Sequence, residues 1–165
     1  MAPTPPTKSL TDLARDNVAT ILANYLREKI NLECYFYTGK FLINTIRDFD
    51  DDTLQPKDYP VLKVFKIKEI PNIAERFIRA EYVISVELLL PEWNILVGIL
   101  NWISQIISKY LFINEISDAI MPDPTSQAEI SYNIKENNQL QKKTKYLNYK
   151  FTTIYNLEKF NNIGK

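Results

Sequence analysis

The sequence predicts an α+β fold, in which a mixed or antiparallel sheet of about four to six strands carries two main helices on one face. The first observation is an alternating segment before Pro91, whose outward face holds Glu81, Ser85 and Glu87. Its apolar face consists of Tyr82, Ile84, Val86 and Leu88. The second observation is a helical repeat after Pro91, in Leu96, Ile99, Leu100, Ile103, Ile107, Tyr110 and Leu111. A strand that leads directly into an amphipathic helix is typical of an α+β core.

The length of 165 residues suffices for one hydrophobic core but is short for two. We therefore predict a flexible arm over residues 1–8, a single α+β domain over 9–158 and a tail over 159–165. The chain has 20 lysines and arginines and 20 aspartates and glutamates. No net charge therefore draws the whole molecule to nucleic acid or to an acidic membrane.

The residue types on which most enzymes depend are scarce. The chain has no histidine and a single cysteine, Cys34, which excludes an internal disulfide and a cysteine-rich zinc site. Cys34 without an activating base is expected to be a small core residue. The three glycines stand far apart, so no glycine-rich loop can cradle a phosphate. We predict a protein that is not an enzyme and that needs no cofactor and no metal.

The longest uncharged run extends from Trp93 to Ser108, and four polar residues interrupt it. Because a membrane-spanning helix needs about 20 residues, we expect a buried helix and no membrane partner. The N-terminus lacks the apolar run of a secretory signal.

In the first half of the chain, Ser9 to about Ile30 has the apolar stripe of a helix. The aromatic-rich segment Leu32 to Tyr37 is expected to be a short strand. Phe41 to Phe49 is ambiguous, although its β-branched residues favour extended structure. Val61 to Ile67 carries apolar residues on both faces, which predicts a central strand.

In the second half, Pro71 to Arg76 is expected to be a connection with a short turn of helix, and Met121 to Gln127 a proline-marked loop. Ala128 to Ile134 alternates through Ile130, Tyr132 and Ile134, which predicts a strand. The polar segment Lys135 to Lys145 is expected to be a long exposed connection. Leu147 to Leu157 then predicts the last strand.

The acidic segment Asp48, Asp50, Asp51 and Asp52, followed by Asp58, allows three interpretations. A solvated loop is the most common outcome for a run of like charges. A metal site would need ligand spacing and a glycine that the segment lacks. The third is a loop that lines a channel and repels DNA as it slides through.

Two further groups of residues invite a functional interpretation. Lys142, Lys143 and Lys145 beside Tyr146 and Tyr149 resemble a single-stranded nucleic-acid site, but Tyr149 falls on the core face, so a solvated hairpin is favoured. Trp93 and Trp102 lie on different helix faces, which predicts one core residue and one interface anchor, with Trp93 our candidate for the interface. Glu81 and Glu87 stand too far apart along a strand to act as a catalytic pair.

The order of elements resembles the tail terminator (tail completion) proteins of long-tailed bacteriophages and related contractile machines. The resemblance rests on the opening helix, on YPVLKVFKI (Tyr59–Ile67), on AEYVISVEL (Ala80–Leu88) running into a long helix, and on the closing strands Ile130–Ile134 and Tyr146–Leu157. The Lys135–Lys145 insertion and the proline-rich arm depart from the pattern.

The resemblance implies a structural virion protein that forms a hexameric ring, caps the tail tube and joins the tail to the neck. Its partners would be further copies of itself and the tube, sheath and neck proteins, with DNA passing only transiently. It would be assembled in the host cytoplasm. Asp48, Asp50, Asp51 and Asp52 would then face the channel. The alternatives are another head–tail connector or tube subunit, a non-viral adaptor that binds a peptide, and a metal-dependent nuclease, which the single acidic loop disfavours.

Overall fold

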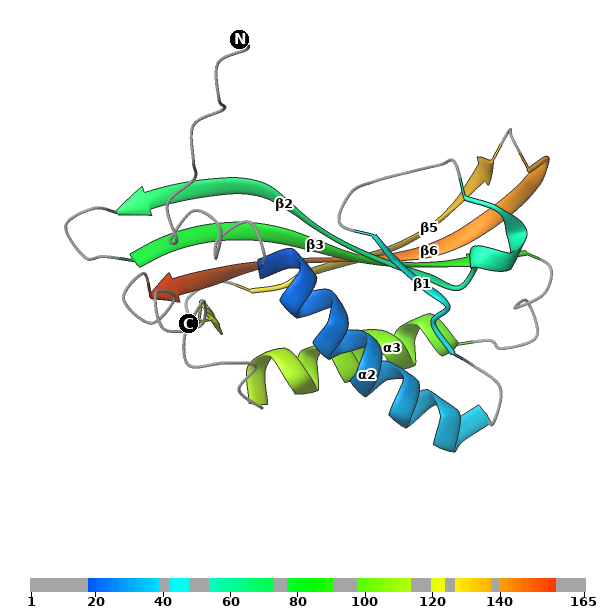
Figure 1. Ribbon diagram of the computed structural model, residues 1–165, viewed down its shortest axis with the longest axis horizontal. Coiled ribbons are helices and arrows are strands. Elements are labelled where there is room, and N and C mark those ends of the chain that lie inside the picture. Colours follow the sequence, from blue (N-terminus) through cyan, green and yellow to red (C-terminus); the bar gives the residue numbers. More distant parts are fainter. Residues whose placement is uncertain are drawn as a thin grey trace, which may run out of the picture.

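The computed structural model describes residues 18–38, 42–47, 54–72, 77–90, 98–113, 120–123, 127–137 and 140–156. It has two layers, a twisted sheet and a pair of helices that lie together on one face of it (Figure 1). The predicted α+β class, with a mixed sheet and both main helices on one face, is confirmed.

The sheet is mixed because one pair of strands is parallel and the other described pairs are antiparallel. Its order is β1-β2-β3-β6-β4. Strand β5 pairs with the same edge of β6 as β4 does, but β5 lies beside the first part of β6 and β4 beside its end. The elements of this layer are β1 (Thr45–Arg47), the 3-10 helix η1 (Pro56–Asp58), β2 (Val61–Asn72), β3 (Phe77–Leu89), β4 (Ile120–Pro122), β5 (Glu129–Asn137) and β6 (Lys142–Asn156).

Helix α2 (Val18–Thr38) extends further than its sequence pattern predicted. Residues at every fourth position are fully buried along it, namely Val18, Leu22, Leu26, Ile30 and Cys34. This spacing places one continuous stripe against the sheet. The strand predicted for Leu32 to Tyr37 is therefore wrong, because Cys34 continues the buried stripe while Leu32 and Tyr35 point outward. The predicted start at Ser9 lies outside the described residues.

Helix α3 (Ile99–Ser108) follows β3, as predicted, and continues into a π-helical turn, η2 (Lys109–Ile113). It begins after Gly98, whose φ of 83° lies in the left-handed region that glycine adopts without strain. Its inner face buries Ile99, Leu100, Ile103, Ile106 and Ile107. None of the described helices has the length and apolarity to cross a bilayer.

Strands β2 and β3 form a long antiparallel hairpin at the centre of the sheet. This confirms the central position predicted for Val61 to Ile67. A bulge interrupts the pairing between Lys66 and Lys68. Strand β2 continues to Asn72, so the connection expected from Pro71 is wrong at its start, and residues 73–76 lie outside the described residues.

Strands β5 and β6 form the second hairpin, and β4 pairs with the end of β6. Two predictions about these three strands are wrong. The exposed connection expected over Lys135 to Lys145 is largely strand, because β5 reaches Asn137 and β6 begins at Lys142. The loop expected from Met121 contains the last two residues of β4, which pairs with β6. The edge of a sheet tolerates such polar and proline-containing strands.

The main core lies between the sheet and the helices and unites α2, α3, β2, β3 and β6. A smaller cluster on the opposite face contains Leu54, Tyr59, Val61 and Leu89, with Leu140 packed against it.

Candidate interaction site

The residues predicted to face a channel lie outside the described residues. Asp48, Asp50, Asp51 and Asp52 fall between β1 and Leu54, and Trp93 falls between Leu90 and Gly98. Their neighbour Asp58 is described, and its carboxylate accepts a hydrogen bond of 2.8 Å from the backbone N–H of Gln55. Asp58 therefore helps to close η1.

Strand β5 is the part of the sheet that the helices leave uncovered. Helix α2 packs against β1 and β2, and α3 packs against α2 and β6. The apolar side chains that β5 turns toward the helix layer remain open, with Ile130 43%, Tyr132 42% and Ile134 59% exposed. These three side chains share the face that carries the helices, yet they stay at the open edge of the sheet.

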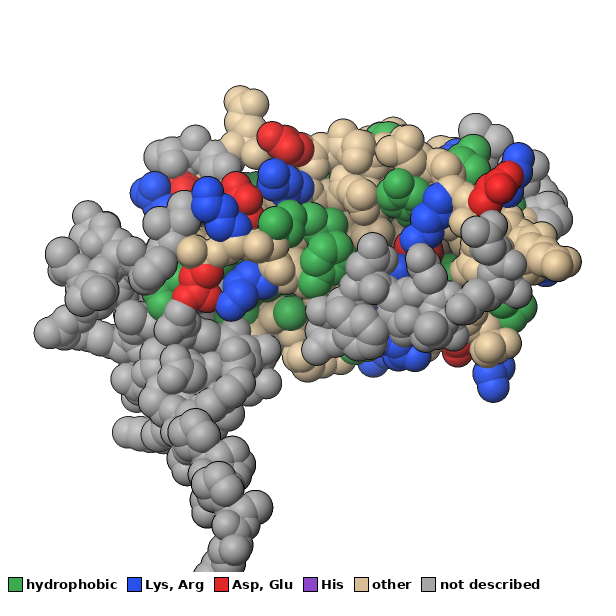
Figure 2. Space-filling view, turned by 90° about the horizontal axis from the view of Figure 1, so that it is seen from above, with side chains coloured by type: hydrophobic (Ala, Val, Ile, Leu, Met, Phe, Trp, Pro, Cys, Tyr) green, Lys and Arg blue, Asp and Glu red, His purple; other side chains and the backbone are tan. Residues whose placement is uncertain are grey.

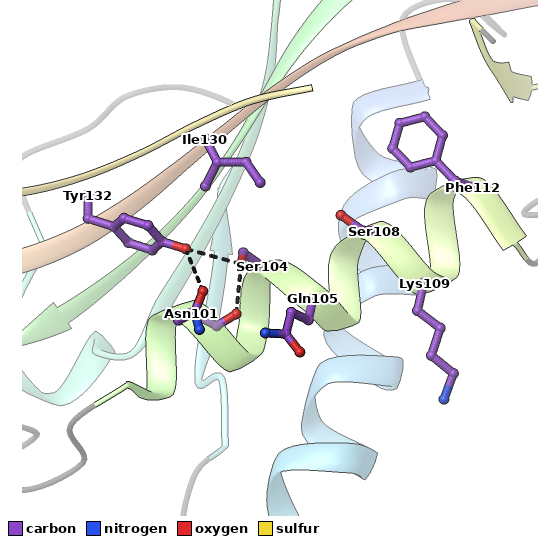
Figure 3. Close-up of a pocket in the computed structure, with 8 residues that line it drawn as sticks. All are labelled: Asn101, Ser104, Gln105, Ser108, Lys109, Phe112, Ile130 and Tyr132. Carbon is purple, nitrogen blue, oxygen red and sulfur yellow. Dashed lines mark hydrogen bonds between the residues drawn. The ribbon is translucent and has the colours of Figure 1, made fainter. Parts of the chain in front are cut away.

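The space beside α3 forms a groove of about 590 Å³ between the helix and β5, which we call the α3–β5 groove (Figure 3). Strand β5 contributes apolar side chains and α3 contributes mainly polar ones. The groove is lined by Asn101, Ser104, Gln105, Ser108, Lys109, Phe112, Ile130 and Tyr132.

Hydrogen bonds between the two walls fix the shape of the groove. The Tyr132 hydroxyl has two hydrogen-bond acceptors in reach, Oδ1 of Asn101 at 3.3 Å and Oγ of Ser104 at 3.1 Å. The Ser104 hydroxyl in turn donates to the Asn101 carbonyl at 2.7 Å. Deeper in the sheet, the hydroxyls of Ser108 and Tyr149 lie 2.6 Å apart. Tyr132 therefore ties the exposed edge strand to α3.

Lys109, the one cation among the described lining residues, points away from Ile130 and Tyr132 (Figure 3). The Lys109 ammonium donates to Oε1 of Glu33 at 2.7 Å, and the Tyr110 hydroxyl donates to the same oxygen at 2.7 Å. These hydrogen bonds, first that of Lys109 and then that of Tyr110, lower the pKa of Glu33 below its ordinary value. The hydrogen bond to Glu33 raises the pKa of Lys109. This pair fastens α2 to the end of α3.

The described residues around the groove offer mainly apolar and hydrogen-bonding side chains. Cys34 is buried in the core as predicted, and burial raises the pKa of its thiol to about 12. Across the described ranges, no three acidic, cysteine or histidine side chains cluster as metal ligands would. The groove therefore offers an apolar strand edge beside hydrogen-bonding groups.

On the other face of the sheet, Glu87 is buried, which corrects the prediction that it faces outward. Its Oε1 accepts from the Lys63 ammonium at 2.9 Å and lies 3.0 Å from that of Lys135. The side chains of Glu87 and Lys63 are 3% and 1% exposed. The arrangement links β2, β3 and β5 by charge, with Glu87 and Lys63 buried and Lys135 partly exposed.

The visible described surface of that face carries basic and acidic side chains side by side, with hydrophobic side chains between them (Figure 2). Such mixing produces no single-sign field that would hold nucleic acid. Of the suggested stacking residues, Tyr149 is fully buried, as its core position predicted.

Sequence reasoning missed the α3–β5 groove although it placed both walls. It placed Asn101, Ser104 and Gln105 on the polar face of the helix and Ile130 and Tyr132 along an alternating strand. The missing information was that α3 packs against β6 and leaves the edge strand β5 half-exposed. Trp102 is 37% exposed on the same helix.

No model of a known protein family matches this chain, and no curated protein matches it.

Proposed function

We propose that the chain is a structural virion protein, a tail terminator that assembles into a ring, caps the tail tube and joins the tail to the neck. The observation that carries this proposal is the order of elements. Helix α2 comes first, β2 and β3 form a central hairpin, α3 directly follows β3, and β5 and β6 form the closing hairpin. This is the order on which the resemblance to tail terminators rests.

The distribution of apolar surface supports an assembling subunit. A cyclic ring needs two different surfaces on each subunit, one for each neighbour. Helix α2 exposes Leu32 and Tyr35, at 50% and 53%, and the helical segment α3–η2 exposes Trp102 and Phe112, at 37% and 41%. These two sets of exposed side chains are our candidates for the two surfaces that would meet neighbouring subunits.

In the proposed ring, the acidic segment Asp48, Asp50, Asp51 and Asp52 lines the channel. Its charge repels the phosphate backbone of passing DNA, so the DNA moves through without being held. The arm over residues 1–8 contacts a tube, sheath or neck protein, and Trp93 anchors an interface between subunits.

The second candidate is another connector or a peptide-binding adaptor, which the open edge of β5 favours. An extended peptide can add to an exposed sheet edge, where backbone hydrogen bonds provide affinity and side-chain pockets provide specificity. An adaptor of this kind would remain at one or two chains and would retain one extended partner in a pull-down.

Negative-stain imaging of the purified full-length chain tests the proposal. We expect closed rings with a central hole. Filaments that grow without limit would contradict a terminator and favour a tube subunit. Particles of one or two chains in every field, with no ring, would contradict the proposal and favour the adaptor.

A further inference from the structure

The outer edge of β5 has little of the protection that exposed strands usually carry, because its one lysine, Lys135, is directed to Glu87, 3.0 Å away. Its pairing with β6 is unbroken from Glu129 to Asn137, and the strand has no proline and no bulge. No described strand pairs with its other edge. Its apolar side chains are the half-exposed Ile130, Tyr132 and Ile134. A long, regular edge with exposed apolar residues is a template for pairing with another strand.

The opposite edge of the sheet is protected. Strand β1 covers only Val61 to Lys63 of β2, which leaves the rest of that edge without a described partner strand. Beyond Lys63, β2 carries the exposed Lys66 and Lys68, a bulge between them and then Pro71. Lysines, bulges and prolines are the features that block edge-to-edge pairing. A contact that joins β5 to β2 of another chain is therefore disfavoured.

We propose that β5 pairs with β5 of a second copy, antiparallel about a two-fold axis through Tyr132. In this register, Ile130 of one chain lies opposite Ile134 of the other, and Tyr132 lies opposite its own counterpart. These residues share the face that β5 turns toward the helix layer, as their pairing with Tyr149, Leu147 and Lys145 of β6 shows. The three apolar side chains of each chain are thus covered by those of the other.

The charges select the same register. On the other face, Glu129 lies opposite Lys135 twice, and Ser131 lies opposite Asn133 twice. The side chain of Glu129 is 78% exposed and that of Lys135 is 29% exposed, and the Lys135 ammonium lies 3.0 Å from Glu87. Opposite charges directly across two strands stabilise the pair.

Neighbouring registers lose this complementarity. An axis through Asn133 places Ile130 opposite Glu136 and Ser131 opposite Lys135. An axis through Ser131 places Glu129 opposite Asn133 and leaves Ile134 opposite Ala128. Only the axis through Tyr132 pairs apolar residues with apolar residues and acid with base.

The contact goes beyond the proposed function and does not rest on it. Subunits of a cyclic ring meet through two different surfaces, whereas this contact uses the same surface twice. If the protein forms rings, this contact joins two rings. If the protein forms no ring, the contact joins two single chains into a dimer.

Disulfide trapping in the full-length chain tests the register. Residues directly opposite on antiparallel strands have Cα atoms about 4.5–5.5 Å apart, which a disulfide can bridge, whereas diagonal residues at about 7–8 Å cannot be bridged without backbone movement. We expect Tyr132→Cys to form dimers under mild oxidation. Ser131→Cys and Asn133→Cys should each remain uncrosslinked alone and crosslink when mixed. The native Cys34 is buried and contributes no background.

Three outcomes would overturn the proposal. The first is that no variant forms crosslinks. The second is that Asn133→Cys or Ser131→Cys crosslinks with itself as much as Tyr132→Cys does. The third is that the crosslinks disappear at low protein concentration although the chain still has the mass of a dimer, because the dimer would then use another surface. Circular dichroism of each variant confirms that it remains folded.

A charge placed on the edge provides an independent test that leaves Tyr132 intact. Ile134→Lys sets a lysine opposite Ile130 of the partner, and we expect the dimer dissociation constant to rise at least tenfold by sedimentation. Ile67→Lys is the matched control, because Ile67 is 50% exposed on the free edge of β2. Equal effects of the two variants would contradict the proposal. If rings survive in Ile134→Lys, the ring does not depend on β5. If crosslinked dimers form but no rings are seen, the β5 contact is present and only the proposed ring function fails.

Discussion

The carboxylate of Glu87 lies between two lysines on the sheet face away from the helices. A single oxygen, Oε1, is 2.9 Å from the Lys63 ammonium and 3.0 Å from that of Lys135. Its other oxygen, Oε2, has no hydrogen-bond partner in the structure. A buried ion pair of this kind specifies the packing of strands more than it stabilises them, because desolvation offsets the attraction. Removing one member leaves the other charged and buried.

Lys63→Met is therefore expected to destabilise the fold by about 3 kcal/mol, since Glu87 then keeps only the lysine from β5. Lys66→Met is the matched control on the same strand. Lys66 pairs with Glu69 at 2.8 Å but is 35% exposed, so its loss should cost less than about 1 kcal/mol. Urea unfolding of both variants measures the difference, and equal losses would contradict the account.

Glu33 should make stability depend on pH. Its hydrogen bonds from Lys109 and Tyr110 lower its pKa in the folded state below the ordinary value of 4.5. A lowered carboxyl pKa contributes stability above the unfolded value, and this contribution is lost as the pH falls through the folded value. Between about pH 5 and pH 3, the wild-type chain should lose more stability than Glu33→Gln.

Unfolding curves at several pH values measure this dependence. Glu28→Gln is the control on the same helix, because Glu28 is exposed and makes neither of these hydrogen bonds. A Glu33→Gln variant with the same acid sensitivity as the wild-type chain would contradict the assignment.

At the scale of elements, periodicity predicted the regular strands and the inner face of α3, but not where elements end. The segment from Leu32 to Tyr37 has aromatic residues typical of a strand, yet it is helical because Cys34 continues the stripe of Leu26 and Ile30. Tertiary packing of a long helix overrides the local preference of a few residues. The polar stretch from Lys135 is a strand because an edge strand need not be apolar.

The α3–β5 groove could not be predicted from periodicity, because an alternating strand has the same sequence whether or not a helix covers it. Its apolar residues Ile130, Tyr132 and Ile134 would belong to the core if the helix layer reached β5. The number of helices over a sheet is a property of the whole chain, and only the structure reveals it.

Gly98 should be important for the start of α3. Its φ of 83° is unfavourable for residues with a Cβ, although a Cβ there would meet no atom within 4 Å. Gly98→Ala is therefore expected to destabilise the chain by about 1 kcal/mol through backbone strain alone. Thermal unfolding measures this loss, and a stabilised variant would show that the helix begins in another conformation.

At the scale of the whole molecule, two kinds of contact are proposed, a cyclic one through the helices and a two-fold one through β5. The balance of 20 basic and 20 acidic residues would give the proposed ring no net charge. The behaviour of DNA in the channel then depends on the local charge of the channel loop.

Replacing Asp48, Asp50, Asp51 and Asp52 with Asn raises the charge of each chain by four. We expect the variant to bind DNA at least tenfold more tightly than the wild-type chain at low salt, because the repulsion of phosphate is lost. Fluorescence anisotropy with a labelled duplex measures the binding. Glu28→Gln serves as the control on α2. Unchanged binding of the fourfold variant would contradict a channel-facing position.

The absolute mass of the purified chain, measured by light scattering at several concentrations, tests the central claim most directly. We expect about six times the chain mass of 19.3 kDa, or about twelve times if two rings join through β5. A mass of one or two chains at every concentration would contradict a ring.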